Sequence, residues 1–229
     1  MDTLWNSFIK AIELIVSLDP EVMEIAGRSL RISITSTLIG SLIFVPVGCL
    51  IQLNEFRGKR FLVVGIIQTL YSVPTVAIGL FVFVFISRAG PLGFLNILFT
   101  PTAIIIGQVL LIAPVLLGLT ISALRGIDKT IPDTARTLGA SGMQLMVLVL
   151  KESRYAVMAA VILAFGRALS EVGISIMVGG NIRGFTRVLT TAISLESSKG
   201  DIEFSMALGI ILLLIAVVAN IIMNRIQQR

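Results

Sequence analysis

The sequence contains no histidine and one cysteine, and only 14% of its 229 residues are charged. The absence of histidine removes the usual general base and the commonest metal ligand, which argues against acid-base or zinc catalysis. The single cysteine, Cys49, lies inside an apolar run, so neither a disulfide framework nor a cysteine-based metal cluster is expected. We therefore assign no catalytic residue and no metal ligand.

Apolar residues make up 56% of the chain, and the mean hydropathy is +1.01. A water-soluble core cannot absorb that proportion, so the composition indicates an integral membrane protein. Five apolar runs are long enough to cross a bilayer, since a transmembrane helix needs roughly 20 apolar residues. They cover residues 30–53, 61–86, 101–124, 155–178 and 204–224. We predict an all-α membrane protein with about five transmembrane helices.

A further apolar run, LWNSFIKAIELIVSL, lies near the N-terminus before these five. It has only 15 residues and contains Lys10 and Glu13. Its length and charge predict an amphipathic helix that lies on a membrane face. A cleaved signal peptide is less favoured, because the start has no basic residues and no small-residue cleavage site follows. Residues 1–28 are expected to form this extracytoplasmic or interfacial segment, ahead of a transmembrane domain in residues 29–229.

An excess of lysine and arginine in short loops marks the cytoplasmic side of a membrane protein. Of the 18 such residues, seven fall on one side, and Arg167 lies within a span. The ten on the other side are Arg57, Lys59, Arg60, Arg125, Lys129, Arg136, Lys151, Arg154, Arg225 and Arg229. This bias predicts that the N-terminus is outside and that the C-terminus and residues 127–154 are cytoplasmic. Topology accounts for the net charge of +5, so no nucleic-acid partner is expected.

The polar stretch IDKTIPDTARTLGASGMQLMVLVLKESR, residues 127–154, carries the signals of two short helices. Thr130 and Asp133 have the spacing of a helix start, and Gly139 is placed to end that helix. The sequence SGMQ that follows repeats the capping-box spacing before an apolar run, which predicts a second helix. Ordinary loop capping would explain such signals in many membrane proteins. Their close spacing here favours a compact cytoplasmic knob that another protein contacts.

The same stretch resembles the EAA loop of ABC importer permeases, whose pattern is Glu-Ala-Ala, three residues and Gly, followed later by Ile-x-Leu-Pro. Asp133, Ala135 and Gly139 match the Glu, the second Ala and the Gly, whereas Thr134 replaces the first Ala and the Leu-Pro ending is absent. The resemblance implies a cytoplasmic coupling loop, residues 125–154, on which an ABC ATPase docks. The docking residues that it implies are Asp133, Thr134, Ala135, Arg136, Gly139 and Ala140.

A second resemblance lies in ALSEVGISIMVGGNIRGFTRVLTTAISLESSKGD, residues 168–201, which is similar to the corresponding region of molybdate and tungstate permeases. The portion GGNIRGFTRVLTTAISLE is most similar to tungstate importers. The resemblance implies an ATP-driven importer of tungstate, with molybdate next, in the inner membrane of a prokaryotic cell. Its implied partners are two cytoplasmic ATPase subunits, an extracytoplasmic oxyanion-binding protein and a second copy of this chain, all assembled around the lipid bilayer.

No G-x-x-x-x-G-K-[ST] sequence occurs, so this chain lacks a P-loop for ATP. ATP and Mg²⁺ are expected at the partner ATPase, and no cofactor is expected on this chain. An ion-coupled secondary transporter is one alternative, although such a protein would be expected to have an uncompensated intramembrane acid and internal repeats. A non-transporting membrane scaffold is another, and its deletion would leave oxyanion accumulation unchanged.

Two sets of polar residues lie within the apolar runs. Gln68, Ser72, Pro74 and Thr75 are possible pore-lining residues, because the proline bends its helix and its neighbours offer polar contacts to an anion. The equal alternative is that these groups satisfy backbone that the proline frees.

Arg167 and Glu171 are four residues apart in the fourth run, which favours an intramembrane ion pair over a substrate contact. On the predicted outer side, Arg183 and Arg187 could attract an oxyanion or pair with acidic residues of a docked binding protein. More commonly, such residues are solvated loop charges.

Overall fold

The computed structural model describes residues 2–227, and its elements over that range are all helical. In order they are α1 (Asp2–Val16), α2 (Pro20–Leu53), η1 (Phe61–Ile67), α3 (Gln68–Leu70), α4 (Thr75–Ile86), η2 (Gly93–Leu95), α5 (Pro101–Arg125), α6 (Thr130–Thr137), α7 (Gly142–Glu152), α8 (Arg154–Leu169), α9 (Gly173–Gly179), α10 (Leu189–Lys199) and α11 (Ile202–Gln227). The all-α prediction is confirmed over these residues. Arg229, one of the ten cations predicted to be cytoplasmic, lies outside them.

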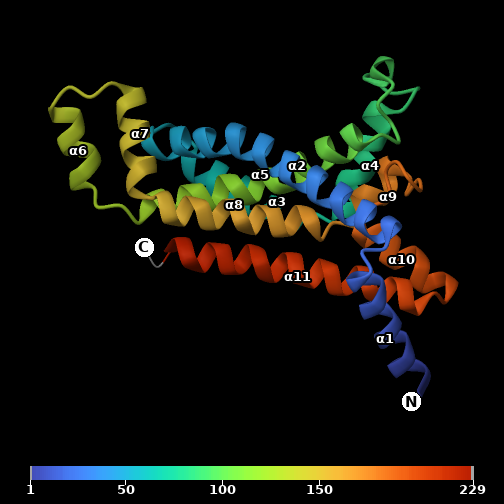
Figure 1. The fold of residues 1–229 in the computed structure, drawn as a ribbon. Coiled ribbons are helices and arrows are strands. Elements are labelled where there is room, and N and C mark those ends of the chain that lie inside the picture. Colours follow the sequence, from blue (N-terminus) through green and yellow to red (C-terminus); the bar gives the residue numbers. More distant parts are fainter. Residues whose placement is uncertain (1, 228–229) are drawn as a thin grey trace.

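Helices α2, α5, α8 and α11 run lengthwise beside one another and form the body of the molecule (Figure 1). Helices α6 and α7 project at one end of this body, where α11 also finishes, and we call this the loop end. Helices α1 and α10 lie at the opposite end, which we call the N-terminal end. The loop and the C-terminal helix thus share one end, as the charge distribution predicts. The assignment of the loop end to the cytoplasm stays a prediction.

Three helices, α2, α5 and α11, are long and apolar enough to cross a membrane, and the bent pair α8 and α9 makes a fourth if it forms one span. The remaining predicted span, residues 61–86, is not one continuous helix. A turn at residues 71–74 separates η1 and α3 from α4. Pro74 has no N–H to donate and occupies the position directly before α4, where a proline is tolerated because no hydrogen bond from its nitrogen is needed. The prediction of a bent but continuous helix is therefore corrected to a broken one.

The N-terminal part of α2 extends well before the predicted start of its span at residue 30. Asp19 caps it by accepting hydrogen bonds from the backbone N–H groups of Glu21 and Val22, both at 3.0 Å, and Pro20 fits the first turn. The predicted domain boundary between residues 28 and 29 therefore falls inside a continuous helix. Helix α2 reaches from one end of the molecule to the other.

Helix α1 confirms that the first apolar run is helical. Its Lys10 forms an ion pair at 2.9 Å with Glu203 at the start of α11, and Ala11 is fully buried. The placement of α1 on a membrane face stays a prediction.

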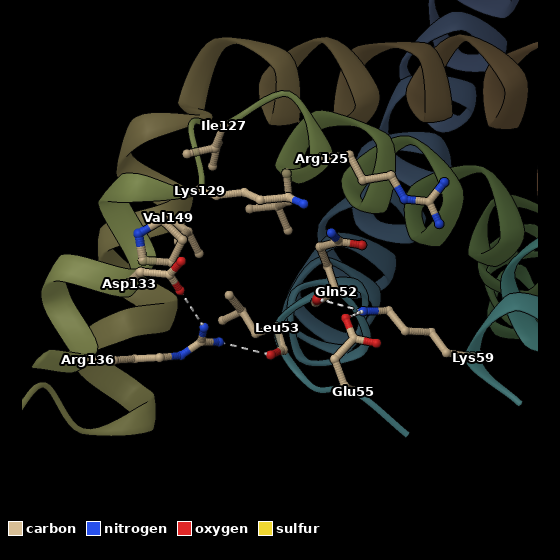
Figure 2. A pocket seen from close by; sticks show the side chains of 12 residues that line it. Gln52, Leu53, Glu55, Lys59, Arg125, Ile127, Lys129, Asp133, Arg136 and Val149 are labelled. Carbon is tan, nitrogen blue, oxygen red and sulfur yellow. Dashed lines mark hydrogen bonds and ion pairs between the residues drawn. The ribbon is translucent and has the colours of Figure 1, made fainter. Parts of the chain in front are cut away.

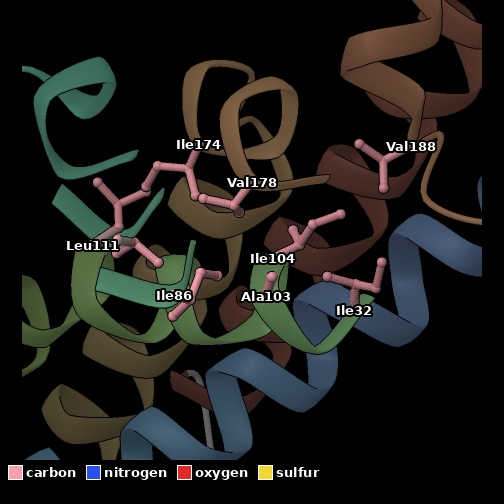
Figure 3. Close-up of a cluster of buried hydrophobic side chains, with 9 residues drawn as sticks. Ile32, Ile86, Ala103, Ile104, Leu111, Ile174, Val178 and Val188 are labelled. Carbon is pink, nitrogen blue, oxygen red and sulfur yellow. The ribbon is translucent and has the colours of Figure 1, made fainter. Parts of the chain in front are cut away.

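The interior is packed by interlocking side chains at sites where backbones approach closely. In one buried cluster, Ile174 and Val178 of α9 pack against Ile104 and Leu111 of α5 (Figure 3). Between α2 and α5, a Cβ atom at Gly40 would lie 2.9 Å from Ile112 Cδ1, so a side chain there would have to displace that isoleucine. Close packing of this kind holds helices together inside a bilayer, where apolar burial alone provides little attraction.

The fourth predicted span bends by 58° between α8 and α9. Side chains from other elements donate to carbonyls on both sides of this break. Gln108 Nε2 of α5 donates to Ala168 O at 3.0 Å, and Thr190 Oγ1 donates to Glu171 O at 2.8 Å. Buried polar backbone needs such partners, so they stabilise a break at a fixed place in the chain.

The break also overturns the predicted ion pair between Arg167 and Glu171. Helix α8 ends at Leu169, so the two residues do not share one continuous helical face. Glu171 is buried, and its Oε1 accepts from the backbone N–H of Ile174 at 2.9 Å, in the first turn of α9. Arg167 is exposed, and no ion pair joins it to Glu171 in the described structure. The acid caps a helix instead of neutralising the arginine.

Candidate functional site

The two-helix loop, residues 126–153, has the helix, glycine turn and helix that the sequence predicts. Gly139 adopts a φ of +80°, a left-handed conformation that favours glycine over residues with a side chain. Helix α7 then starts at once with a complete capping box. Gln144 N–H donates to Ser141 Oγ at 3.4 Å, and Ser141 N–H donates to Gln144 Oε1 at 2.8 Å. The turn and the second helix start are therefore confirmed.

The start of α6 differs in detail from the prediction, because Thr130 and Asp133 do not form its cap. Asp128 Oδ1 instead accepts from the backbone N–H of Thr130 at 2.9 Å and from its hydroxyl at 2.5 Å. These two hydrogen bonds favour the charged carboxylate and lower the pKa of Asp128. Asp128, two residues before α6, thus holds the first residue of that helix, and Asp133 pairs with Arg136 at 3.1 Å.

The predicted docking residues do not all face outward. Thr134 and Gly139 are exposed, as are Asp133 and Arg136, whereas Ala135 and Ala140 are half-buried. Ala135 belongs to the apolar packing at the base of the loop and not to its outer surface.

The two most exposed apolar side chains of the loop are missing from the predicted docking set. Leu138 is 83% exposed, the highest value among the exposed large apolar residues in the described structure, and Met143 is 66% exposed. Neither lies on a long membrane-crossing helix. The signal that would have found them is an apolar residue on each side of the Gly139 turn in a cytoplasm-predicted loop. Exposed apolar groups of this kind mark protein contact sites.

An apolar cluster anchors the loop to the helical body. Leu145 and Val149 of α7 are buried against Cys49 of α2 and Leu124 of α5. Because α7 packs against both α2 and α5, a displacement of the loop would press on or pull these two helices.

A cavity of about 560 Å³ lies between the two-helix loop and the ends of α2 and α5 (Figure 2). Arg136 reaches across one side of it from α6. Its Nη2 donates to Leu53 O at 3.1 Å, and its Nη1 donates to Asp133 Oδ1 at 3.1 Å. The guanidinium therefore bridges the loop and the final carbonyl of α2.

Lys59 closes another side of the same cavity. Its Nζ donates to Gln52 O at 2.9 Å and to Glu55 Oε1 at 2.8 Å. The neighbouring ammonium lowers the pKa of the exposed Glu55 carboxyl. Together, Lys59 and Arg136 place positive charge at the negative end of α2, an arrangement that stabilises a helix terminus.

The predicted pore-lining residues gather at the break in the second span. Gln68, Ser72 and Pro74 are exposed, and Thr75 is half-buried at the start of α4. The fold brings this region against the break in the fourth span, since a Cβ atom on Gly173 would lie 3.1 Å from Thr75 Oγ1. Two interrupted spans thus meet, although the sequence suggested only one interruption. The pore-lining role of these residues stays a prediction.

The two outer-side arginines both form ion pairs within the chain, but Arg183 remains a largely exposed loop charge and Arg187 is buried. Arg183 forms two hydrogen-bonded contacts with Glu21 of α2, through Nε at 2.7 Å and through Nη2. Arg187 is buried, with its Nη1 3.3 Å from Glu196 Oε1, and Lys199 reaches the same carboxylate at 2.9 Å. These contacts tie the N-terminal end of α2 to the segment before α10 and to the last turns of α10.

These features define a class of protein: a multi-pass helical membrane protein with interrupted spans and a compact two-helix loop at one end. Residues 44–229 match the family described as the binding-protein-dependent transport system inner membrane component. The chain belongs to this family, and it is a permease component of an ABC transporter in a cell's inner membrane.

Individual relatives and solved structures agree with this assignment. The chain is 41% identical to the tungstate uptake system permease protein TupB of Peptoclostridium acidaminophilum over 228 residues, covering 100% of both chains. It is 36% identical to the protein of the same name from Campylobacter jejuni, covering 100% of this chain and 95% of the relative. A bacterial alginate ABC transporter, solved in complex with a periplasmic protein bound to an alginate pentasaccharide, has the same fold. Its TM-score is 0.76 at 17% identity, covering 99% of this chain and 89% of that one.

Proposed function

We propose that this chain is the permease subunit of a tungstate importer, with molybdate as its next substrate. The observation that carries the proposal is the 41% identity, across the whole of both chains, to a relative named for tungstate uptake. Tungstate and molybdate are both tetrahedral divalent oxyanions, so a path that admits one is suited to the other. Selection between them falls to an extracytoplasmic binding protein that delivers the anion to the N-terminal end.

In this proposal the loop end faces the cytoplasm, the N-terminus lies outside, and the two-helix loop docks on a partner ATPase. The sequence has no P-loop, so ATP and Mg²⁺ are held by that partner and no cofactor is held by this chain. The support for docking is the exposed pair Leu138 and Met143 on a loop that α7 fixes to the body. Apolar side chains that fill pockets on a partner supply much of the binding energy at protein interfaces.

A second copy of the chain completes the path in a homodimer. The support is the exposed polar side chains of Gln68 and Ser72, which lie beside Pro74 at the break before α4. Polar groups at membrane depth are tolerated where they line a water-filled cavity or face another protein surface. The path then lies between the two copies, with no catalytic chemistry in this chain.

A matched pair of glycine variants tests the docking role. Gly139 has a φ of +80°, whereas Gly142 is an ordinary helical residue with open space around it. Gly139→Ala strains the left-handed turn by about 1–2 kcal/mol, and we expect about fivefold less ATPase to co-purify with a tagged permease. Gly142→Ala should retain the ATPase at the wild-type level. Equal retention by both variants would contradict docking on the turn, provided that both insert into the membrane normally.

Uptake by a reconstituted complex tests the substrate. Vesicles containing the permease and its ATPase should accumulate tungstate when the binding protein and ATP are supplied, and excess molybdate should compete more strongly than sulfate. Accumulation by the permease alone under an ion gradient would instead establish a secondary transporter. ATP-dependent uptake of sulfate in preference to tungstate would overturn the substrate assignment.

A further inference from the structure

The C-terminal end of α2, which we propose to lie in the cytoplasm, is held by side chains from different parts of the chain. The last carbonyls of a helix have no partner within it, so other donors must satisfy them. Here Asn54 Nδ2 donates to Leu50 O at 3.0 Å, and Lys59 donates to Gln52 O at 2.9 Å. Both donors follow α2 closely in sequence. The donor to the final carbonyl comes from elsewhere, namely from the two-helix loop.

Arg136 of α6 is that donor, with its Nη2 3.1 Å from Leu53 O (Figure 2). Among the described residues, this is the one side-chain hydrogen bond that joins α6 to an element outside the two-helix loop. The Asp133 carboxylate holds the other nitrogen at 3.1 Å and so aims the guanidinium at α2. A hydrogen bond from a charged donor to a carbonyl at a helix C-terminus is stronger than a neutral one.

Helix α2 connects this contact to the opposite end of the molecule. It contains 34 residues, which corresponds to roughly 51 Å of helix. At its far end, Arg28 Nη1 donates to Arg187 O at 3.0 Å, and Ser29 Oγ accepts from Leu189 N–H at 2.7 Å. Helix α2 therefore forms hydrogen bonds with the two-helix loop near one end and with the α10 region near the other. Helix α2 is continuous between these two sets of contacts, with Pro46 inside it, so we expect a displacement of α6 that is passed to Leu53 to reach the α10 region.

We propose that Arg136 is a positioning residue that transmits the movement of α6 to α2, and thereby couples ATP hydrolysis to opening of the path at the N-terminal end. This inference rests on the proposed function, because it requires an ATPase that moves the loop. It separates two roles within the loop. Leu138 and Met143 face outward to the ATPase, whereas Arg136 reaches inward to the body. Loss of the Arg136 side chain should leave the ATPase docked, but ATP hydrolysis should then drive less tungstate accumulation.

The test uses the reconstituted complex of permease, ATPase and binding protein in vesicles, with three variants. Arg136→Ala removes the bond to Leu53, and Arg136→Lys retains a cation with a single donor group in place of the planar fork. Arg125→Ala removes a cation that lines the same cavity and has no hydrogen bond to α2 in the described structure. For each variant, three quantities are measured: ATPase retained on the tagged permease, ATP hydrolysed, and tungstate accumulated.

We expect Arg136→Ala to retain the ATPase within about twofold of wild type while tungstate accumulated per ATP falls about tenfold, the effect of losing one charge-assisted hydrogen bond. Arg136→Lys should recover part of that ratio, and Arg125→Ala should keep it unchanged. A merely structural role would lower the yield of folded complex without changing this ratio.

Two results would overturn the inference. If Arg136→Ala retains the ATPase and keeps the wild-type ratio, the bond to α2 transmits nothing. If the ATPase is lost from this variant, Arg136 is a docking contact and not a positioning residue. Failure of the proposed function has a different signature, because then the wild-type permease retains no ATPase and shows no ATP-dependent accumulation.

Discussion

The two ends of the molecule differ in where their most buried charges and their most exposed apolar loop residues lie. At the N-terminal end, the charged side chains of Arg183 and Arg187 are bonded to carboxylates of the same chain. At the loop end, the apolar side chains of Leu138 and Met143 stand exposed on a rigidly capped projection. Buried ion pairs such as Arg187 with Glu196 hold a local structure in place, whereas exposed apolar side chains on a capped loop favour contact with another protein. The contrast supports the proposed ATPase contact at the loop end, and it sets that contact apart from the buried charges of Arg187 and Glu196 with Lys199, which we call the N-terminal clamp.

The largest effect should come from reversing the apolar character of the loop end. Leu138→Asp places a charge where the proposed interface excludes water, so we expect ATPase retention on the tagged permease to fall at least about tenfold. Ile182→Asp is the matched control, because Ile182 is an exposed apolar residue, at 43%, near the opposite end. Retention should be unchanged in that variant. Equal loss in both, or in neither, would break the comparison between the two ends.

The next effect concerns the clamp at the N-terminal end. Glu196→Gln removes the charge that Arg187 and Lys199 share, and both Arg187 and Glu196 are buried. Breaking a buried ion pair leaves an unpaired charge and costs about 3 kcal/mol, which should lower the melting temperature of the detergent-purified protein by several degrees. Arg183→Ala removes an exposed cation and should shift it little. If Arg183→Ala lowered the melting temperature more than Glu196→Gln does, the exposed ion pair and not the buried one would be the main stabilising contact.

The smallest effect is expected at the start of α6. Asp128→Ala removes the cap on Thr130, and ATPase retention should fall less than about threefold, whereas Asp128→Asn still offers a capping oxygen and should behave as wild type. Because the pKa of Asp128 is lowered in the folded loop, this stabilisation is present above the ordinary aspartate pKa and is lost as pH falls through the lowered value. Retention by Asp128→Asn should not show this loss. Identical acid sensitivity in both proteins would rule out the carboxylate as its source.

Local features of the fold and site could be predicted from the sequence because their signals are close together in the chain. The turn at Gly139 and the capping box of Ser141 and Gln144 each depend on a few neighbouring residues, and both are confirmed. The apolar runs likewise predict most of the long helices. These features do not depend on how distant parts of the chain pack.

The features that the sequence did not predict depend on distant partners. The break after α8 is stabilised by Gln108, which is 60 residues from the carbonyl that it serves, so periodicity within the run gives no sign of it. In the sequence Arg187 resembles an ordinary loop cation, whereas in the structure it is buried between Glu196 and the start of α2. The bond from Arg136 to Leu53 spans 83 residues. A single sequence indicates which groups are costly to bury, but not which distant groups satisfy them.

The most direct test of the central claim is tungstate accumulation by vesicles that contain the wild-type complex, compared with vesicles that contain Leu138→Asp, each with and without ATP. The account predicts ATP-dependent accumulation by the wild-type complex and almost none by the variant, whose permease is inserted at a normal level. Accumulation by both to the same extent, or by the permease in the absence of any ATPase, would contradict it.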